Sequence, residues 1–540
     1  MRFLRLEGLL RRGRENNMKF HVCVAILVVI MGCSRPGESE SMPSTDEPSP
    51  PPELRAEVPD GGAGPDSIEF AGLNEPRGVR VNKPTNTPGY VLFTPFLSDI
   101  TYLVDREGRV VHVWKSDFAP GSEYLLEDGQ LMRGARLPEV PRFSGGGQGG
   151  RIEKLGWDGE LTWFFELADE SRLLHHDFQP MPNGNILAIA WEAKQPEEAQ
   201  AAGRAPELIP RAGLWPDLII EIQPTAEGGD IVWEWHAWDH MIQSQDASMR
   251  NYGEPRDHPR KIDINAGPPL PTLSAEELNH LKATNRQPGS ATLEDRGSDM
   301  FHSNAIDYNA TLDQIVISVR SLSEIWIIDH DTTTQAAAGP AGDLLFRWGS
   351  PKAYGYEMSE SAGLGHQHDI RWIPEGYPGA GNLMAFSNGV TDASPPYSEV
   401  VEFVPPIDDN GRYPLGTGQP FGPDQAAWTY SDNGFFSPFV SGAHRMSNGN
   451  TLVTFGPQGR FVEVTPAGEI VWEYWTPYSG EVRMPDGSWP QPGAPFVYAT
   501  FRATFIPADH EALAGRNLEP LDPQPAASVL REEELAPFRK

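Results

Sequence analysis

Residues 178–187 read Phe-Gln-Pro-Met-Pro-Asn-Gly-Asn-Ile-Leu, and a second segment at 230–235 reads Asp-Ile-Val-Trp-Glu-Trp. The same pair of segments recurs as His-Arg-Met-Ser-Asn-Gly-Asn-Thr-Leu at 444–452 and Gly-Glu-Ile-Val-Trp-Glu-Tyr at 468–474. Asn-Gly between apolar runs is a strong hairpin signal, because both residues tolerate a positive φ. Each copy therefore predicts a hairpin that is followed by further strands.

Relatives of this pattern divide the chain into six repeat units. They lie near residues 89–118, 125–170, 174–240, 300–350, 365–432 and 438–475. Repeats of this length, with about four strands each, are typical of a β-propeller. A linear array of β-sandwiches is the alternative, but it gives no role to the strand-like residues 496–505, which in a propeller return to complete a blade where the ring closes.

The fold prediction is therefore an all-β protein, a six-bladed β-propeller with a disordered lipoprotein tether at the N-terminus. The propeller occupies residues 67–510 and a C-terminal tail follows at 511–540. An insertion near 241–298, rich in Pro, Asn and charge, interrupts it between the third and fourth units. This insertion either covers the channel mouth or contacts another subunit.

An apolar run at residues 21–31 has the length of a signal-peptide core and is too short to span a membrane comfortably. It ends in Ile-Met-Gly-Cys, which resembles the lipobox of bacterial lipoproteins. We predict a lipoprotein signal peptide at 1–33 that starts at Met18, lipidation of Cys33, and a flexible linker at 34–66. The predicted location is the bacterial cell envelope, lipid-anchored to the outer membrane on its periplasmic side or at the cell surface.

Composition excludes several functions. The formal net charge of −32 argues against nucleic acid as a partner, because a phosphate backbone would be repelled. The chain has two cysteines, Cys23 in the signal core and Cys33 at the predicted lipid site. The mature domain therefore has no cysteine that could form a disulfide, bind a metal or act as a nucleophile.

Three histidines stand at the heads of separate repeat units. They are His176 in Leu-His-His-Asp-Phe, His302 in Phe-His-Ser-Asn, and His368 in His-Gln-His-Asp-Ile. The first strand of a propeller blade lines the central channel, so equivalent positions in different blades face one axis. We expect these three imidazoles to meet there.

Arg320 and Asn304 join this group in the prediction. His302 and Arg320 lie at nearly equal distances from a turn near Thr311, so they would be neighbours in an antiparallel hairpin. Asn304 is two residues from His302 and would face the same way. A guanidinium, an imidazole and an amide at one place suit a tetrahedral oxyanion such as a sulfate or phosphate ester.

Taken together, the motifs resemble the PAPS-independent arylsulfate sulfotransferases, a family of exported bacterial six-bladed propellers. The matching segments are His-His-Asp-x-x-x-Met-Pro-Asn-Gly-Asn at 175–185, His-Ser-Asn-Ala-Ile-Asp-Tyr at 302–308, Ser-Val-Arg at 318–320, Gln-His-Asp at 367–369 and Asn-Gly-Asn-Thr-Leu at 448–452. The resemblance implies transfer of a sulfuryl group from an aryl sulfate to a phenol through a sulfo-histidine intermediate, with ping-pong kinetics and no cofactor.

The resemblance also implies roles for residues. His368 would be the nucleophile, His302 and Arg320 would hold the sulfuryl oxygens, and His176 would be a second acid/base or an oxyanion contact. The choice between His175 and His176 stays open, with His176 preferred. The residues predicted to contact substrate are Asn304, His175, His366 and His444. No metal site is predicted.

Two other functions compete with sulfuryl transfer. One is a non-catalytic propeller lipoprotein that binds a ligand or an envelope partner. The other is a metal-dependent hydrolase that uses the three histidines as ligands, since three histidines with an open position are a known zinc arrangement. Arg320 counts against the metal site, because a cation beside a metal is unfavourable. An oligomer is possible, but the sequence does not indicate one.

Overall fold

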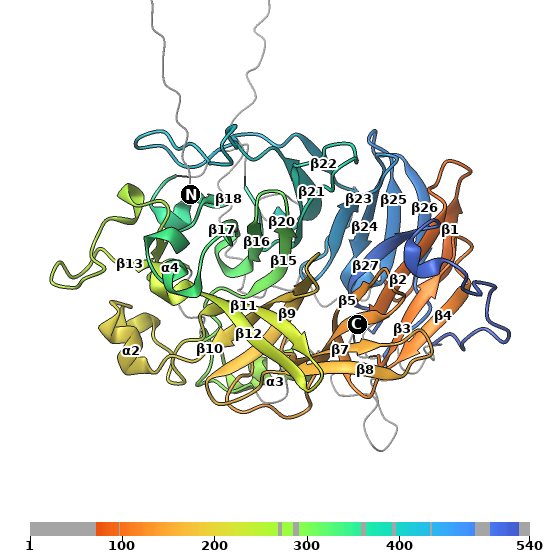
Figure 1. Ribbon diagram of the computed structural model, residues 1–540, viewed down its shortest axis with the longest axis horizontal. Coiled ribbons are helices and arrows are strands. Elements are labelled where there is room, and N and C mark those ends of the chain that lie inside the picture. Colours follow the sequence, from red (N-terminus) through yellow and green to blue (C-terminus); the bar gives the residue numbers. More distant parts are fainter. Residues whose placement is uncertain are drawn as a thin grey trace, which may run out of the picture. The chain divides into compact units, whose positions relative to one another are not determined.

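Six antiparallel sheets follow one another around a ring in the computed structural model (Figure 1). It describes residues 72–96, 98–267, 273–283, 291–357, 363–390, 396–432, 435–480 and 497–528. The chain divides into two compact units, Met1–Arg55 and Ala56–Lys540, and all described residues belong to the second. The predicted signal peptide, Cys33 and the linker lie outside the described residues, so they stay predictions.

Each sheet is one blade, and its strands run from the channel outwards. The first three blades contain β27 (Thr500–Pro507), β2 (Gly89–Pro95), β3 (Ile100–Val104) and β4 (Val110–Lys115); β5 (Ala119–Leu125), β6 (Leu131–Arg136), β7 (Gly150–Leu155) and β8 (Leu161–Glu166); and β9 (Arg172–Pro180), β10 (Ile186–Glu192), β11 (Asp217–Thr225) and β12 (Gly228–His236). The other three contain β15 (Ser303–Asn309), β16 (Gln314–Val319), β17 (Glu324–Asp329) and β18 (Phe346–Trp348); β19 (His368–Trp372), β20 (Leu383–Val390), β21 (Tyr397–Phe403) and β22 (Trp428–Tyr430); and β23 (Gly442–Arg445), β24 (Thr451–Phe455), β25 (Arg460–Val464), β26 (Ile470–Trp475) and β1 (Gly78–Asn82).

The inner strands close a continuous ring around the axis. In order they are β27, β5, β9, β15, β19 and β23, and each contacts the next, with β23 returning to β27. The prediction of a six-bladed all-β propeller is confirmed.

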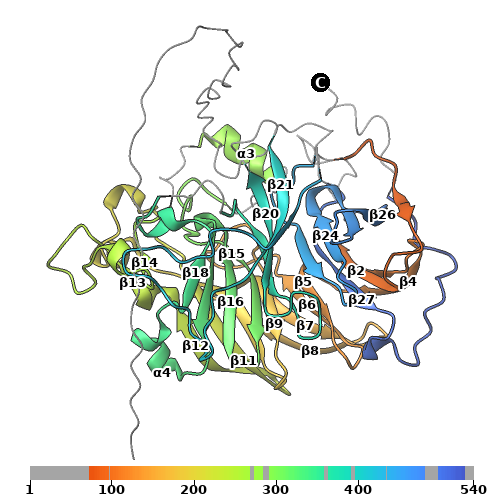
Figure 2. The ribbon, with the colours of Figure 1, turned by 90° about the horizontal axis from the view of Figure 1, so that it is seen from above.

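The first and the last described strands both join the blades that meet at the closure of the ring. The C-terminal strand β27 pairs with β2 as the inner strand of blade one, so the predicted return of the chain is confirmed for the described residues of that segment. The N-terminal strand β1 pairs with β26 at the outer edge of blade six, which the sequence did not predict. Figure 2 shows the strands of these two blades side by side.

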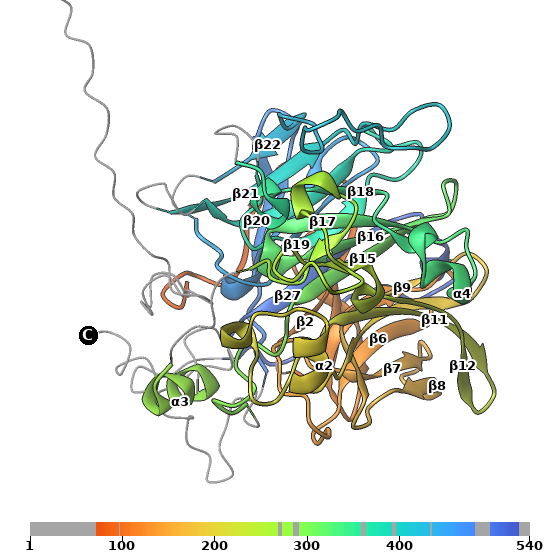
Figure 3. The same cartoon turned by 90° about the vertical axis from the view of Figure 1, so that its left-hand side faces the viewer.

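The insertion between blades three and four holds little regular structure. Within its described part, β13 (Met241–Ile242) pairs in parallel with β14 (Ile262–Asp263), and α3 (Ala275–Ala283) follows. Two further helices are α2 (Pro196–Ala201) and α4 (Thr334–Ala337). Helices α3 and α4 lie on opposite faces of the ring of blades (Figure 3).

Aromatic side chains at the outer ends of the repeats pack the blades together. Trp235 is fully buried against the fourth blade, and its indole N–H donates to the carbonyl of Gly342 at 2.8 Å. Trp472 is fully buried too, and its indole N–H donates to the carbonyl of Arg106 in blade one at 2.8 Å. The recurring Trp-Glu-Trp and Trp-Glu-Tyr endings thus serve blade packing rather than the channel.

A buried carboxylate joins blades one and six at the closure. Glu463 on β25 is fully buried and pairs with the guanidinium of Arg106. It also accepts hydrogen bonds from the backbone N–H and hydroxyl of Thr87 at 2.9 and 2.7 Å, and from the amide of Asn450 at 2.6 Å. Because the partners come from both blades, this cluster should stabilise the closed ring.

Replacing Glu463 by Leu should lower the free energy of unfolding by about 3–5 kcal/mol, because Arg106 would be left buried without its counter-charge. Glu469→Leu is the matched control, since its pair with Lys83 joins the same two parts of the chain but is exposed, and such pairs contribute about 1 kcal/mol or less. Denaturant unfolding measures both. Equal losses would mean that the Glu463 cluster does not hold the ring closed.

Candidate active site

The inner strands cannot form ladders with one another, so acidic side chains connect them. Asp177 on β9 accepts from the backbone N–H of Ile306 on β15 at 3.3 Å, and Asp307 on β15 accepts from that of Trp372 on β19 at 2.8 Å. Asp369 on β19 accepts from the N–H of Ala443 on β23 at 3.1 Å. These contacts give hydrogen-bond acceptors to backbone N–H groups that would otherwise be buried without partners at the strand edges.

At the head of these strands the backbone leaves the extended conformation. His176, His302 and His366 have φ of 53°, 52° and 50°, a left-handed region that non-glycine residues rarely adopt. The register also shifts between Ser303 and Ala305. Side chains therefore do not alternate between the two faces at these positions as they do along a regular strand. The local turns set the directions of the histidine side chains instead.

His368 is held in one tautomer. Its Nδ1 lies 2.7 Å from Oδ1 of Asn388, whose Nδ2 donates to the carbonyl oxygens of Ser437 and Val440, each at 2.8 Å. Since those carbonyls only accept, the amide orientation is fixed and Oδ1 must accept the Nδ1 proton. Nε2 of the neutral imidazole then carries the lone pair.

His302 is paired with a buried carboxylate. Its Nδ1 lies 2.5 Å from Oδ2 of Asp299, and Oδ1 of Asp299 accepts from the indole of Trp191 at 3.0 Å. Burial alone would raise the pKa of Asp299, but His302 and the hydrogen bonds to this carboxylate hold that pKa below its usual value. An ionised carboxylate on Nδ1 leaves Nε2 of His302 able to take up and release a proton.

The two adjacent histidines of β9 have different surroundings. The His175 ring is buried, stacks on Trp191 with centroids 4.1 Å apart, and has Nε2 3.3 Å from Oδ1 of Asp217. The His176 ring meets that of His302 edge-on, with centroids 4.5 Å apart, and its Nδ1 lies 2.8 Å from Nδ1 of His175. His176 therefore belongs to the cluster, and His175 stands behind it.

The cation of Arg320 acts on two of these rings. Burial and the cation of Arg320 lower the pKa of His368 to about 3, so this imidazole is neutral at pH 7. Burial lowers the pKa of His176 well below its usual range, and the neighbouring imidazoles and Arg320 act in the same direction. An oxyanion bound among His176, His368 and Arg320 would thus be stabilised.

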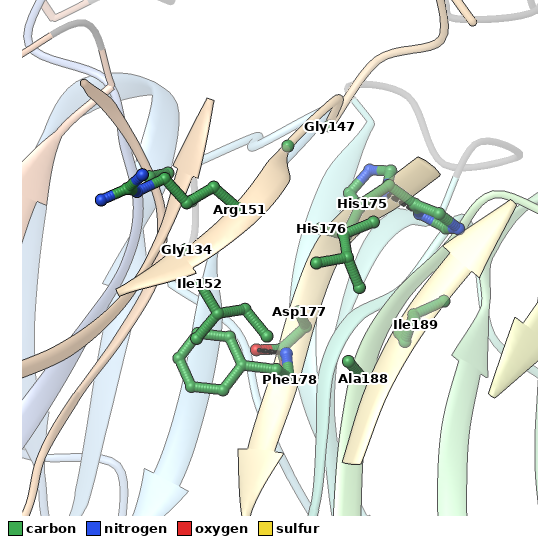
Figure 4. A pocket seen from close by; sticks show the side chains of 14 residues that line it. Gly134, Gly147, Arg151, Ile152, His175, His176, Asp177, Phe178, Ala188 and Ile189 are labelled. Atoms are coloured by element: carbon green, nitrogen blue, oxygen red, sulfur yellow. Dashed lines mark hydrogen bonds between the residues drawn. The ribbon is translucent and has the colours of Figure 1, made fainter. Parts of the chain in front are cut away.

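A glycine-rich loop closes over the cluster. A Cβ on Gly147 would stand 2.0 Å from Nε2 of His176, and one on Gly146 would stand 3.3 Å from Cε1 of His302. The carbonyl of Gly147 also accepts from the N–H of His176 at 2.8 Å. Figure 4 shows Gly147 near the two histidines of β9, with Asp177 farther along the strand. Only glycine permits so close an approach.

The insertion reaches the same end of the channel. A cavity of about 70 Å³ is lined by Asp299 and His302, by Gly146 of the glycine loop, and by Leu278 and Arg296 of the insertion. The hydroxyl of Ser144 also donates to the carboxylate of Asp295, which ties the loop to the insertion.

The structure separates the remaining predicted residues. Asn304 is fully buried, and its amide donates to the carbonyl of Gln367 at 2.8 Å, so it bridges blades four and five. His366 donates its backbone N–H to the hydroxyl of Ser323 at 3.1 Å, where the chain passes between the same blades. His444 lies apart, in a second cavity, with its Nε2 accepting from the N–H of Phe505 at 3.0 Å.

Sequence reasoning missed several contributors. Asn388, Asp299 and Asp217 orient histidines from positions with no recognisable motif. The run Ser-Gly-Gly-Gly-Gln-Gly-Gly at 144–150 was visible, and its density of glycine was a signal for close approach of the backbone to other groups.

Among the residues that the structure describes, no group of three or more His, Cys, Asp or Glu side chains is arranged to hold a metal ion. No helix in that part of the chain is long and apolar enough to cross a membrane.

Fold and site together define a β-propeller with a buried cluster of histidines at one end of its channel. The family model for Arylsulfotransferase (ASST) matches residues 90–473, most of the chain, and the protein therefore belongs to this family. Membership supports an aryl sulfotransferase-type activity on small molecules in general.

Other comparisons add little. No curated protein matches the chain. Solved structures that resemble it include a protein of unknown function from Bacteroides caccae, with 10% identity, a TM-score of 0.38, and coverage of 78% of this chain and 99% of that one. Another is a functionally unknown protein from Desulfotomaculum acetoxidans DSM 771, with 6% identity, a TM-score of 0.35, and coverage of 72% and 95%. At these scores neither likeness informs function.

The substitution Gly147→Ala should displace the His176 ring, because the new methyl group would overlap Nε2. Gly159→Ala is the matched control: both glycines have a positive φ, 76° and 84°, but nothing lies within 4 Å of a Cβ at Gly159. Ring nitrogen NMR signals of His176 and His302 should shift in the first variant only. Unchanged signals in both variants would show that the loop does not confine the ring.

Proposed function

We propose that the protein transfers a sulfuryl group from an aryl sulfate to a phenol through a covalent adduct on His368. The observation that carries this proposal is the fixed tautomer of His368, whose Nε2 lone pair lies in a cluster with Arg320. A neutral imidazole is a competent nucleophile at neutral pH. Family membership and the cation of Arg320 near the ring support the same reaction.

In the first half-reaction, Nε2 of His368 attacks the sulfur of the aryl sulfate. The N–S bond forms as the S–O bond to the aryl group breaks, and the departing phenolate takes a proton from His302. In the second half-reaction His302 removes the proton of the incoming phenol, whose oxygen attacks the sulfur. The N–S bond then breaks and the neutral imidazole of His368 is restored.

The neighbours divide the remaining tasks. Arg320 would hold the sulfuryl oxygens, because its charge is permanent and its donors suit an oxyanion. We assign the proton transfers to His302 rather than to His176, since His302 has a carboxylate on Nδ1 whereas Nε2 of His176 faces the glycine loop. His176 would then serve as an oxyanion contact, one of the two roles that the sequence suggested for it.

The variant His368→Ala should reduce phenol-stimulated release of nitrophenolate from 4-nitrophenyl sulfate to the uncatalysed background. Without phenol, the native protein should gain the mass of one sulfuryl group, which peptide mapping should place on His368. His236→Ala is the matched control, because this histidine pairs with Glu192 and Glu234 outside the cluster. Full activity in a folded His368→Ala variant would overturn the assignment.

His302→Gln should slow transfer from phenyl sulfate more than from 4-nitrophenyl sulfate. Phenol is the weaker acid, so its departure depends more on proton donation, and acid catalysis contributes about 10²–10⁴-fold. The kcat/KM for release of each phenol measures the difference, with His368→Ala as the variant that should affect both donors alike. Equal losses for both donors would mean that His302 binds the sulfuryl oxygens instead.

A further inference from the structure

A second cavity, of about 250 Å³, opens at the other end of the channel. Of the predicted site residues, His302 directly precedes β15 and His368 begins β19, while His176 lies within β9 at a residue of positive φ. Residues such as Trp372 and Pro507, which line this cavity, stand at the ends of inner strands or just beyond them. We call it the axial cavity. His444 lines it, so a histidine that the sulfuryl site leaves unused lies here.

Buried ion pairs separate the axial cavity from the histidine cluster. Arg502 on β27 donates to both carboxylate oxygens of Asp177, at 2.8 and 2.6 Å, and to Asp369 at 3.4 Å. The hydroxyl of Tyr124 accepts from Arg502 at 2.7 Å and donates to Asp177 at 3.0 Å. Arg502, Asp177 and Asp369 are almost entirely buried and Tyr124 is half-buried against them, so the network lies between the two groups of residues.

The acceptors in the wall of the axial cavity are already engaged. Both oxygens of Asp307 accept backbone N–H groups, from Tyr308 at 2.9 Å and Trp372 at 2.8 Å. Asp369 accepts from Arg371, from Arg502 and from the backbone N–H of Ala443. Arg445 also lines the cavity, but its guanidinium is already paired with Glu402.

Two hydrogen-bond donors in the wall, by contrast, have no acceptor among the described residues. Arg371 uses Nε for Asp369 at 2.8 Å and Nη2 for Tyr124 at 3.4 Å, and its Nη1 has no acceptor among the described residues. His444 accepts the N–H of Phe505 on Nε2, so its proton is on Nδ1, which has no acceptor in that same part of the chain. Burial lowers the pKa of His444 to about 4, which keeps it a neutral donor at pH 7. The wall thus presents a guanidinium and an imidazole N–H to an incoming acceptor.

The rest of the wall is apolar and aromatic. Trp372, Tyr377 and Phe505 contribute rings, and Met384 and Met446 contribute flexible thioethers. A flat apolar body would bury its surface against these groups, and a cavity of this size holds a bicyclic aromatic ring.

We propose that the axial cavity binds an aromatic carboxylate, with the carboxylate on Arg371 and His444 and the ring against Tyr377 and Trp372. A planar carboxylate matches the fork of a guanidinium, and a single charge suits a wall that already contains Asp307 and Asp369. The inference concerns a second site and does not depend on sulfuryl transfer.

The test is calorimetric titration of the full chain with 2-naphthoate, which has neither a phenol group nor a sulfuryl group. Binding should persist in His368→Ala, which removes the nucleophile proposed for the other end of the channel. It should weaken about tenfold or more in Arg371→Gln, the loss expected for a charge-assisted hydrogen bond. It should also weaken about fivefold in Tyr377→Ala, a half-buried position whose change spares the ion pairs of the core.

Neutral 2-naphthamide is the matched ligand control and should bind the native protein at least about tenfold more weakly than 2-naphthoate. Because Arg371 pairs with Asp369, thermal unfolding checks the fold of each variant, and Tyr377→Ala decides the question if Arg371→Gln does not fold. The proposal is overturned if 2-naphthoate fails to bind, or if binding is lost in His368→Ala and unchanged in Tyr377→Ala. Sulfuryl transfer is measured separately, so either proposal can fail without the other.

Discussion

The ion pairs of Arg502 with Asp177 and Asp369 hold the centre of this molecule. Three charges are buried there, and the free-energy cost of burying each one is offset only by its pairing with the others. The three residues come from blades one, three and five, so the network can form only when the ring has its full number of blades. Asp177 and Asp369 each follow a histidine directly in the sequence, and the same contacts that fix the carboxylates also fix the strand heads that carry His176 and His368.

Local sequence patterns predicted the parts of the structure that depend on local physics. The Asn-Gly turns at 183–184 and 448–449 form hairpins as expected, because their φ requirements involve only neighbouring residues. Counting such patterns was enough to predict six blades and the return of β27.

Contacts between distant residues could not be predicted in this way. Strand β1 is short and lies outside the six repeat units, so nothing in its sequence indicates that it joins β26. The expectation that Asn304 faces the channel beside His302 rested on strict alternation, which fails where His302 adopts a left-handed conformation and the register shifts. Asn388 meets His368 across a hairpin of blade five, and its orientation is set by carbonyls from the next connection, which no motif encodes.

Ring closure by the last strand has a consequence for the timing of activity. A ribosome makes β27 after all the other described strands, and until it arrives both oxygens of Asp177 lack the guanidinium of Arg502. An incomplete chain therefore buries the carboxylate of Asp177 without this counter-charge, which disfavours the arrangement of strands that brings His176 and His368 together. The strands that carry the histidine cluster are therefore held together by Arg502 only after β27 has been made, and chains that end before residue 500 would lack this contact.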